Sequence, residues 1–221
     1  MRRVNAVVSK LPTSPSEILA LDLDLVKLQR RVGSSTALDA LFRTWILAAA
    51  AHFEEQTGRP VMRADFEYRL DCFPPCDRFI EIPRAPLVSV SSITYAVDGS
   101  PDTATVDTDT YSVQAPVGLH CAPGRIVLAS GASWPTPSQQ QGAVVIAFTA
   151  GYAETSADVP ALIQSALFFL VGHFHKYGEE VIGGPDASSL QKIPLGAEKL
   201  FEAFKFSALP TQALWEVPWL A

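Results

Sequence analysis

The hydrophobic pattern of this chain changes period twice, and this change limits its fold more than any other feature of the sequence. Before Pro60 and after Gly151, apolar residues recur at the three- and four-residue spacing of helices. Between these two residues lie six short runs that alternate or are β-branched and are separated by turn residues: 66–70, 79–82, 87–97, 111–113, 125–128 and 143–149. No helical segment separates the runs, so the pattern disfavours parallel β-α-β units and predicts an antiparallel sheet or sandwich.

The order of the segments predicts an α+β protein: a helical bundle with an inserted small antiparallel β module and a C-terminal extension. We assign residues 1–34 to an N-terminal arm and first helix, and residues 35–59 to the first part of the helical core. The β module spans residues 60–151. The second part of the helical core covers 152–206, and a C-terminal tail follows at 207–221.

The first helix is predicted to begin at Ser14, which can cap its N-terminus, with Pro15 in its first turn. It should run to about Val32 and end at Gly33. Its apolar positions mix periods near Asp22, which would allow a break there.

A second helix is predicted from Ser35 and Thr36, with Asp39 in the capping-box position. It should stop at Gly58. The alanines at 48–51 leave a flat strip that another helix could approach closely.

A third helix is predicted to follow Pro160, with one continuous apolar stripe: Leu162, Ile163, Ala166, Leu167, Leu170, Phe174 and Tyr177. Phe168, Phe169 and Val171 lie off this stripe. A helix that is apolar on nearly every side must be covered on nearly every side, either at the centre of the fold or at a subunit interface.

A short amphipathic helix is predicted over 195–206, and the tail at 207–221 follows it. The tail contains Trp215 and Trp219, two large side chains that are costly to leave in water. Two interpretations remain open: the tail folds back on its own domain, or it is an arm for a neighbouring subunit or partner.

Composition excludes several classes of protein. The chain has 221 residues, of which 48% are hydrophobic, so it can build a core and is not disordered as a whole. Only 18% of residues are charged and the net charge is −6, which disfavours a protein that clamps nucleic-acid phosphates. Three cysteines do not make a disulfide scaffold and favour a reducing compartment. No apolar run is long enough for a signal peptide or a membrane span, so we expect a soluble, unprocessed protein.

The sequence offers one weak candidate for a metal site. Cys72 and Cys76 have a C-x3-C spacing, and His120 with Cys121 could complete a four-ligand zinc set, but adjacent ligands on an extended chain point in opposite directions. Buried free thiols are the simpler interpretation.

The remaining histidines and motifs do not indicate chemistry. His173 and His175 are two apart on a helix and face different ways, and His52 is typical of a helix surface. No G-x-S-x-G elbow, phosphate-binding loop or H-E-x-x-H motif is present. We therefore expect no cofactor, no metal and no enzymatic activity.

An ordered series of short motifs covers roughly residues 35–206: EEQTGRP at 54–60, IEIPRAPL at 80–87, VSSITY at 90–95, PGRI at 123–126, WP at 134–135, FTAGY at 148–152, VPAL at 159–162 and IPLGA at 193–197. In this order and spacing the chain resembles the head–tail connector (adaptor) family of long-tailed phages and phage-like gene transfer agents. The first residues and the tail lie outside the pattern.

The resemblance implies a virion protein of the head–tail junction, assembled in the bacterial cytoplasm. It would form a ring, commonly of twelve copies, beneath the portal protein, contact a tail-side stopper or tail-completion protein, and surround passing double-stranded DNA without reading its sequence. No membrane partner is expected. Side-to-side packing would use the apolar and alanine-faced helices: Trp45, Ala49, Phe168, Phe169 and Phe174.

In related connectors the C-terminal segment often reaches the portal, and four tail residues have the anchor chemistry for such docking: Leu214, Trp215, Pro218 and Trp219.

Two other functions remain as alternatives. One is a monomeric carbohydrate- or protein-binding β module with helical appendages, and the other is a zinc- or thiol-dependent enzyme.

Overall fold

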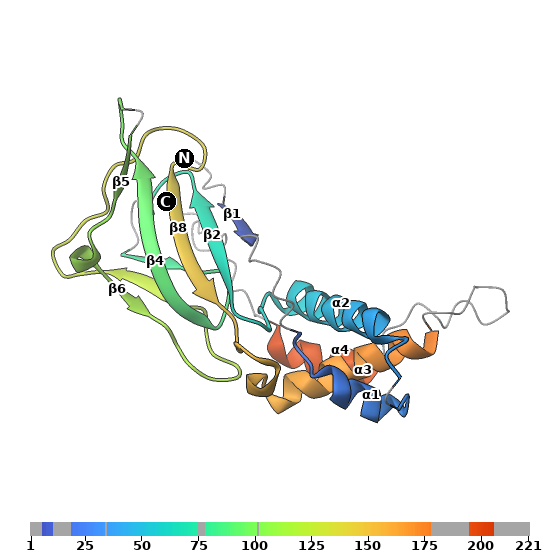
Figure 1. Cartoon of the computed structure of the whole chain (residues 1–221). Coiled ribbons are helices and arrows are strands. Elements are labelled where there is room, and N and C mark those ends of the chain that lie inside the picture. The colour runs from blue at the N-terminus through green and yellow to red at the C-terminus, as the bar shows by residue number, and fades with distance from the viewer. Residues whose placement is uncertain are drawn as a thin grey trace, which may run out of the picture.

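The predicted change of period corresponds to two lobes in the structure, a computed structural model that describes residues 6–10, 19–33, 35–74, 78–100, 102–177 and 195–205. One lobe is built of strands and the other of helices, and they lie end to end (Figure 1). The chain crosses from the helices to the strands before residue 64 and returns after residue 150. The mixed α+β class is therefore confirmed.

The larger sheet has five strands in the order β1-β2-β8-β4-β5, with these bounds: Ala6–Lys10, Ala64–Leu70, Val144–Ala150, Leu87–Ala96 and Thr103–Thr105. The smaller sheet has the order β3-β7-β6: Phe79–Glu81, Arg125–Leu128 and Tyr111–Gln114. Every neighbouring pair is antiparallel, as the alternating pattern predicts. The described residues also include two short 3-10 turns: Thr108–Thr110 and Ser156–Asp158.

The core of the β lobe follows the two-residue period of its strands. β8 is buried at every second position, and Phe148 on it stacks on Phe66 of β2 with 5.5 Å between the ring centroids. The other buried residues come from both sheets, including Ile80, Ile93 and Ile126. Alternate positions of β8 therefore form the centre of this lobe.

Two strands were not predicted. β1 belongs to the N-terminal segment, which the sequence assigns to an arm and a helix, yet it pairs with β2 at the edge of the larger sheet. β5 has only three residues and pairs with β4 across the turn at Gly99, whose φ is +75°. Both strands lie at an edge, where pairing with a neighbour decides the structure more than the local pattern does.

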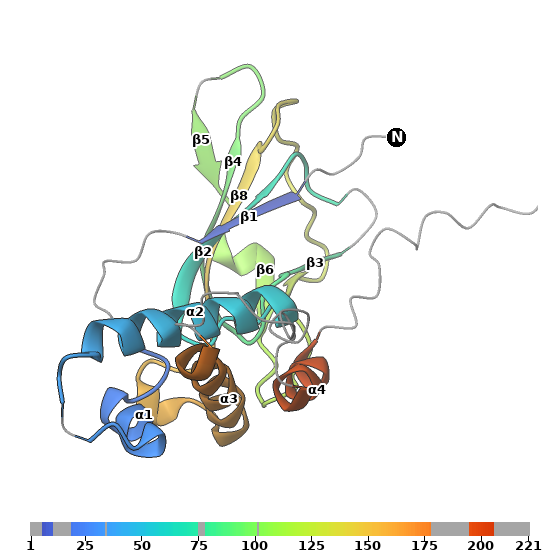
Figure 2. The ribbon, with the colours of Figure 1, turned by 90° about the vertical axis from the view of Figure 1, so that its right-hand side faces the viewer.

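The described residues form four helices in the helical lobe: α1 Leu23–Arg30, α2 Asp39–Thr57, α3 Ala161–Tyr177 and α4 Leu195–Phe204. In Figure 2, α2 lies across α3 and α4, and α1 lies beside α3. Their buried side chains form one core, with Phe42, Phe53, Leu167 and Phe204 among its largest members. None of the helices described is long and apolar enough to cross a membrane.

The first helix is shorter than predicted. Residues 19–22 are not helical, and α1 begins after Asp22, whose carboxylate accepts the backbone N–H groups of Asp24 and Leu25. It ends at Arg31, which takes the left-handed conformation at φ +57°, so Gly33 is not its end. The expected cap at Ser14 lies outside the described residues. The mixed periods near Asp22 mark the start of the helix.

The capping box predicted for the second helix is wrong, whereas its end is confirmed. α2 begins at Asp39, and the residue before it makes no side-chain cap. Asp39 instead accepts a hydrogen bond of 2.8 Å from the buried ammonium group of Lys27, which ties α1 to α2. Gly58 ends the helix at φ +71°, as predicted.

The buried stripe of α3 differs from the predicted one at three positions, because Val171 is buried while Leu162 and Phe174 are only half-buried. Val171, predicted to lie off the stripe, is 1% exposed, and it joins Ile163, Ala166, Leu167 and Leu170 in the core. The stripe is displaced because α3 packs against both α2 and α4, which together cover a broader sector than one partner would.

Candidate functional site

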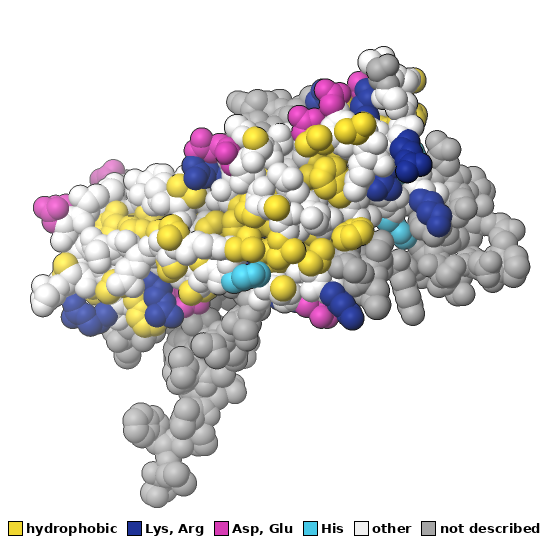
Figure 3. Space-filling model, turned by 90° about the horizontal axis from the view of Figure 1, so that it is seen from below, with side chains coloured by type: hydrophobic (Ala, Val, Ile, Leu, Met, Phe, Trp, Pro, Cys, Tyr) yellow, Lys and Arg dark blue, Asp and Glu magenta, His cyan; other side chains and the backbone are white. Residues whose placement is uncertain are grey.

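The outer side of α1 and α3 leaves large apolar side chains in water. Leu25 and Leu28 on α1 are 53% and 75% exposed, and Phe169 on α3 is 52% exposed. Figure 3 shows hydrophobic side chains running across this lower side of the molecule, with charged groups mostly towards its edges. We call Leu25, Leu28 and Phe169, together with Phe168, the α1/α3 face.

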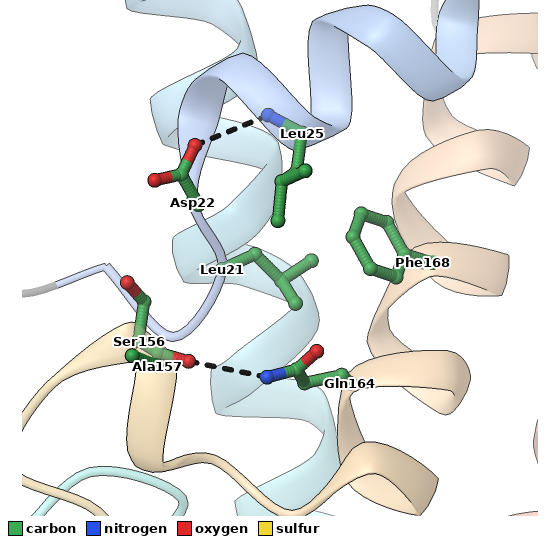
Figure 4. Close-up of a pocket in the computed structure, with 7 residues that line it drawn as sticks. All are labelled: Leu21, Asp22, Leu25, Ser156, Ala157, Gln164 and Phe168. Carbon is green, nitrogen blue, oxygen red and sulfur yellow. Dashed lines mark hydrogen bonds between the residues drawn. The ribbon is translucent and has the colours of Figure 1, made fainter.

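A small pocket of about 120 Å³ lies within this face (Figure 4). Its lining comes from the start of α1, the turn before α3 and α3 itself: Leu21, Asp22, Leu25, Ser156, Ala157, Gln164 and Phe168. The Asp22 carboxylate caps α1, and the Gln164 amide donates to the carbonyls of Ser156 and Val159 at 3.2 and 3.0 Å. These two polar groups make hydrogen bonds within the fold, so the pocket offers an apolar contact surface and no evident reactive group.

The outer side of α2 is also poor in charge. Its exposed positions from 40 to 51 are Ala40, Thr44, Leu47, Ala48 and Ala51. Leu47 is 49% exposed, and the Thr44 hydroxyl donates to the carbonyl of Ala40 and so faces its own helix. A helix side in contact with water normally carries Lys, Arg or Glu. We call these five residues the α2 face; α2 lies above α1 and α3 in Figure 2.

The five residues predicted at a subunit interface have different environments. Phe169 is exposed, whereas Trp45, Phe168 and Phe174 are half-buried. Ala49 is fully buried in the core, so its side chain cannot contact another subunit in this conformation. Ala49 is buried because it lies three residues after Ile46 and four before Phe53, on the same buried side of α2.

Trp45 on α2 belongs to an aromatic cluster with Phe42 of the same helix and His175 of α3. The Trp45 ring lies 5.3 Å from that of Phe42 and 5.7 Å from that of His175. His173 packs against the Phe174 ring, and burial lowers the pKa of His173, helped by the nearby charge of Lys176. His175 therefore packs α3 against α2, whereas the ring contact of His173 is with a neighbour on its own helix.

The metal site finds no support in the part of the chain that the structure describes. No group of three or more His, Cys, Asp or Glu residues there could hold an ion. Cys72 is half-buried and Cys121 is buried, both as free thiols, while Cys76 falls outside the described residues. The ring of His120 packs on Phe204, 4.9 Å between centroids.

A buried arginine at the junction of the lobes was missed by the sequence analysis as a site residue. Arg59 is 4% exposed and follows the left-handed Gly58 at the end of α2. Its guanidinium donates to the carbonyls of Phe204 and Cys121 at 2.8 and 2.9 Å, and to the hydroxyl of Tyr152 at 3.1 Å. One sequence signal could have revealed it: Arg59 is a charged residue between Gly58, which ends a helix, and Pro60. Both neighbours are residues that turn the chain.

Tyr152 completes this junction. Its hydroxyl accepts from Arg59 and donates to the carbonyl of Leu119 at 2.7 Å, which requires the phenol to keep its proton. Burial raises the pKa of Tyr152, and the neighbouring thiol of Cys121 raises it further, while the Arg59 guanidinium acts in the opposite direction. The phenol therefore stays neutral at physiological pH.

The predicted docking residues of the tail cannot be compared with the structure. Leu214, Trp215, Pro218 and Trp219 lie outside the described residues. The last described position is Lys205, just after α4, so the tail follows directly on the helix end that contacts Arg59.

No protein-family model matches the chain, and no curated protein matches it. Solved structures do match. A chain from the neck of an empty gene transfer agent particle, computed with C6 symmetry, has a TM-score of 0.70 at 22% identity, covering 90% of this chain and 95% of that one. A chain from the virion of a native gene transfer agent particle has a TM-score of 0.66 at 23% identity, with the same coverage.

A third chain, from the neck of a native particle computed with C12 symmetry, has a TM-score of 0.63 at 21% identity and covers 90% of this chain and 94% of that one. The three likenesses extend over both lobes and show the fold that this chain shares with them.

Proposed function

We propose that this protein is a structural subunit of a head–tail connector, an adaptor in the neck of a phage or phage-like gene transfer agent particle. The observation that carries the proposal is the likeness of fold, over 90% of the chain, to chains in neck and virion structures of gene transfer agents. The ordered motifs of the sequence point to the same family independently of the fold.

The subunit would act within a ring of identical copies, of about twelve, under the portal. A ring closes when two different faces of one subunit meet around an axis. The α1/α3 face and the α2 face are two such faces, and both are poor in charge and exposed in the part of the chain that the structure describes. The α1/α3 face presents large side chains, while the α2 face presents mainly alanines, so one can receive the other. Trp45, Phe168, Phe169 and Phe174 would contribute to these contacts.

The ring would continue the DNA channel from the portal towards a tail-side stopper or tail-completion protein. The net charge of −6 on each subunit repels DNA phosphates, so it favours passage of DNA through the ring over binding of DNA to it. The role needs no catalytic group, and the protein would act mechanically, by sealing the joint.

The tail would dock on the portal. Leu214, Trp215, Pro218 and Trp219 combine the aromatic and aliphatic side chains that anchor interfaces. Its attachment to α4, at the junction of the lobes, gives all copies in a ring the same starting point for this arm.

A test of the function uses the organism that produces the particle. Deleting the gene should leave DNA-filled heads and separate tails, and restoring the full chain should rejoin them in electron micrographs. A chain ending at residue 207 should be expressed and folded but should fail to bind the portal. Complete particles without the gene would reject the connector role, and unchanged portal binding by the truncated chain would reject docking by the tail.

A further inference from the structure

The C-terminus of α4 depends on a residue distant in sequence. The last carbonyls of a helix have no partner within the helix, and its dipole favours a positive charge at that end. The last turn of α4 carries no basic residue. The Arg59 guanidinium supplies both needs, because its Nε donates to the carbonyl of Phe204 at 2.8 Å.

The same guanidinium also binds the segments that join the lobes. Its Nη2 donates to the carbonyl of Cys121 at 2.9 Å, and its Nη1 donates to the Tyr152 hydroxyl at 3.1 Å. Through Tyr152 the contact extends to the carbonyl of Leu119. One planar group thus joins the end of α4, the 119–121 segment and the chain that returns from β8.

The other contacts of α4 are mainly apolar. The ring of Phe53 meets the rings of Phe201 and Phe204 with 5.5 and 5.4 Å between centroids, and His120 meets Phe204. A ten-residue helix is too short to persist without tertiary support. Ring contacts tolerate sliding and rotation, whereas a hydrogen-bonded fork fixes both direction and distance.

We propose that Arg59 is a positioning residue that fixes the end of α4 to the junction of the lobes, and so sets the point and direction at which the C-terminal tail leaves the body. The positioning itself concerns the isolated protein. Its consequence for docking on the portal rests on the proposed function.

The test compares Arg59→Met with Arg63→Met in the full chain. Arg63 lies in the same connecting segment but pairs with the exposed carboxylate of Glu154, so it provides a matched control. Hydrogen exchange followed by mass spectrometry should show α4 amides exchanging about tenfold faster or more in Arg59→Met, with β8 amides unchanged. Arg63→Met should change neither.

A second measurement reports position directly. Spin labels carried by unnatural amino acids at the exposed Ala48 and Glu202 leave the native cysteines in place. The distance between them should be narrowly distributed in the wild type and in Arg63→Met, and broad in Arg59→Met. Arg59→Lys, which keeps the charge but loses the fork, should also broaden it. Should Arg59→Met fail to fold, Arg59→Lys and Tyr152→Phe provide the same comparison.

Three results would overturn the positioning role: an unchanged distance distribution, unchanged exchange in α4, or equal acceleration of α4 and β8, which would indicate a general loss of stability. Portal binding separates this inference from the proposed function. If Arg59→Met loosens α4 and weakens portal binding, both stand. If α4 loosens while neither this variant nor the truncated chain changes portal binding, the positioning role stands and docking by the tail is wrong.

Discussion

Replacing Phe169 by aspartate perturbs the proposed ring contact at its most exposed aromatic residue. The exposed 52% of this side chain corresponds to roughly 100 Å² of apolar surface. Covering that surface with a neighbouring copy would contribute about 2.5 kcal/mol at each contact. Losing it weakens each contact about 60-fold, and a buried carboxylate without a partner weakens it further.

The assay is a competition. Tagged wild-type and Phe169→Asp chains are expressed together in a strain that lacks the gene, and their ratio is measured in purified particles. We expect the variant to be almost excluded, although its melting temperature should stay within a few degrees of the wild type because about half of the side chain is already exposed to water. Thr103→Asp, an exposed position on β5, is the control and should be incorporated normally. Equal incorporation of Phe169→Asp would refute the assignment of the α1/α3 face.

Three further predictions concern stability. Gly151 has φ +135°, and an added Cβ would lie 2.5 Å from the carbonyl oxygen of Met62, so Gly151→Ala should cost about 2–4 kcal/mol in the free energy of unfolding, measured with urea. Burial raises the pKa of Tyr152, so the stability that the neutral phenol contributes is complete below pH 10 and is lost as the pH rises through the folded-state pKa. Tyr152→Phe should therefore lose less stability than the wild type in alkaline denaturation, and identical pH profiles would contradict this reasoning. Asp39→Ala leaves the buried ammonium group of Lys27 without its carboxylate and should destabilise the protein by about 2–3 kcal/mol. The double variant Asp39→Ala with Lys27→Met should recover part of this loss, and thermal melts of both variants measure it.

The sequence predicted those parts of the fold that depend on local pattern. The six short runs of the β module became strands, and the stop of α2 at Gly58 was correct, because alternation and a left-handed glycine are properties of neighbouring residues. The capping box failed because Asp39 pairs with Lys27, a partner on another helix. The edge strands β1 and β5 were missed because their structure depends on a partner strand.

The candidate site was predictable only in outline. Excess apolar surface on the third helix was evident from Phe168 and Phe169, since no periodicity could bury every side of that helix. Which positions are covered and which are exposed could not be predicted, because this depends on where α2, α3 and α4 meet. Ala49 and Val171, both buried, are examples. Arg59 was overlooked as a site residue because its partners, Phe204 and Tyr152, are distant in sequence.

The most direct test of the central claim is the location of this protein in purified particles, by electron microscopy with a gold-labelled affinity tag at a β-lobe loop. For a connector subunit, the label should lie at the junction of head and tail, arranged as a ring around the channel. Label on a tail fibre, along the tail tube or absent from the particles would contradict it.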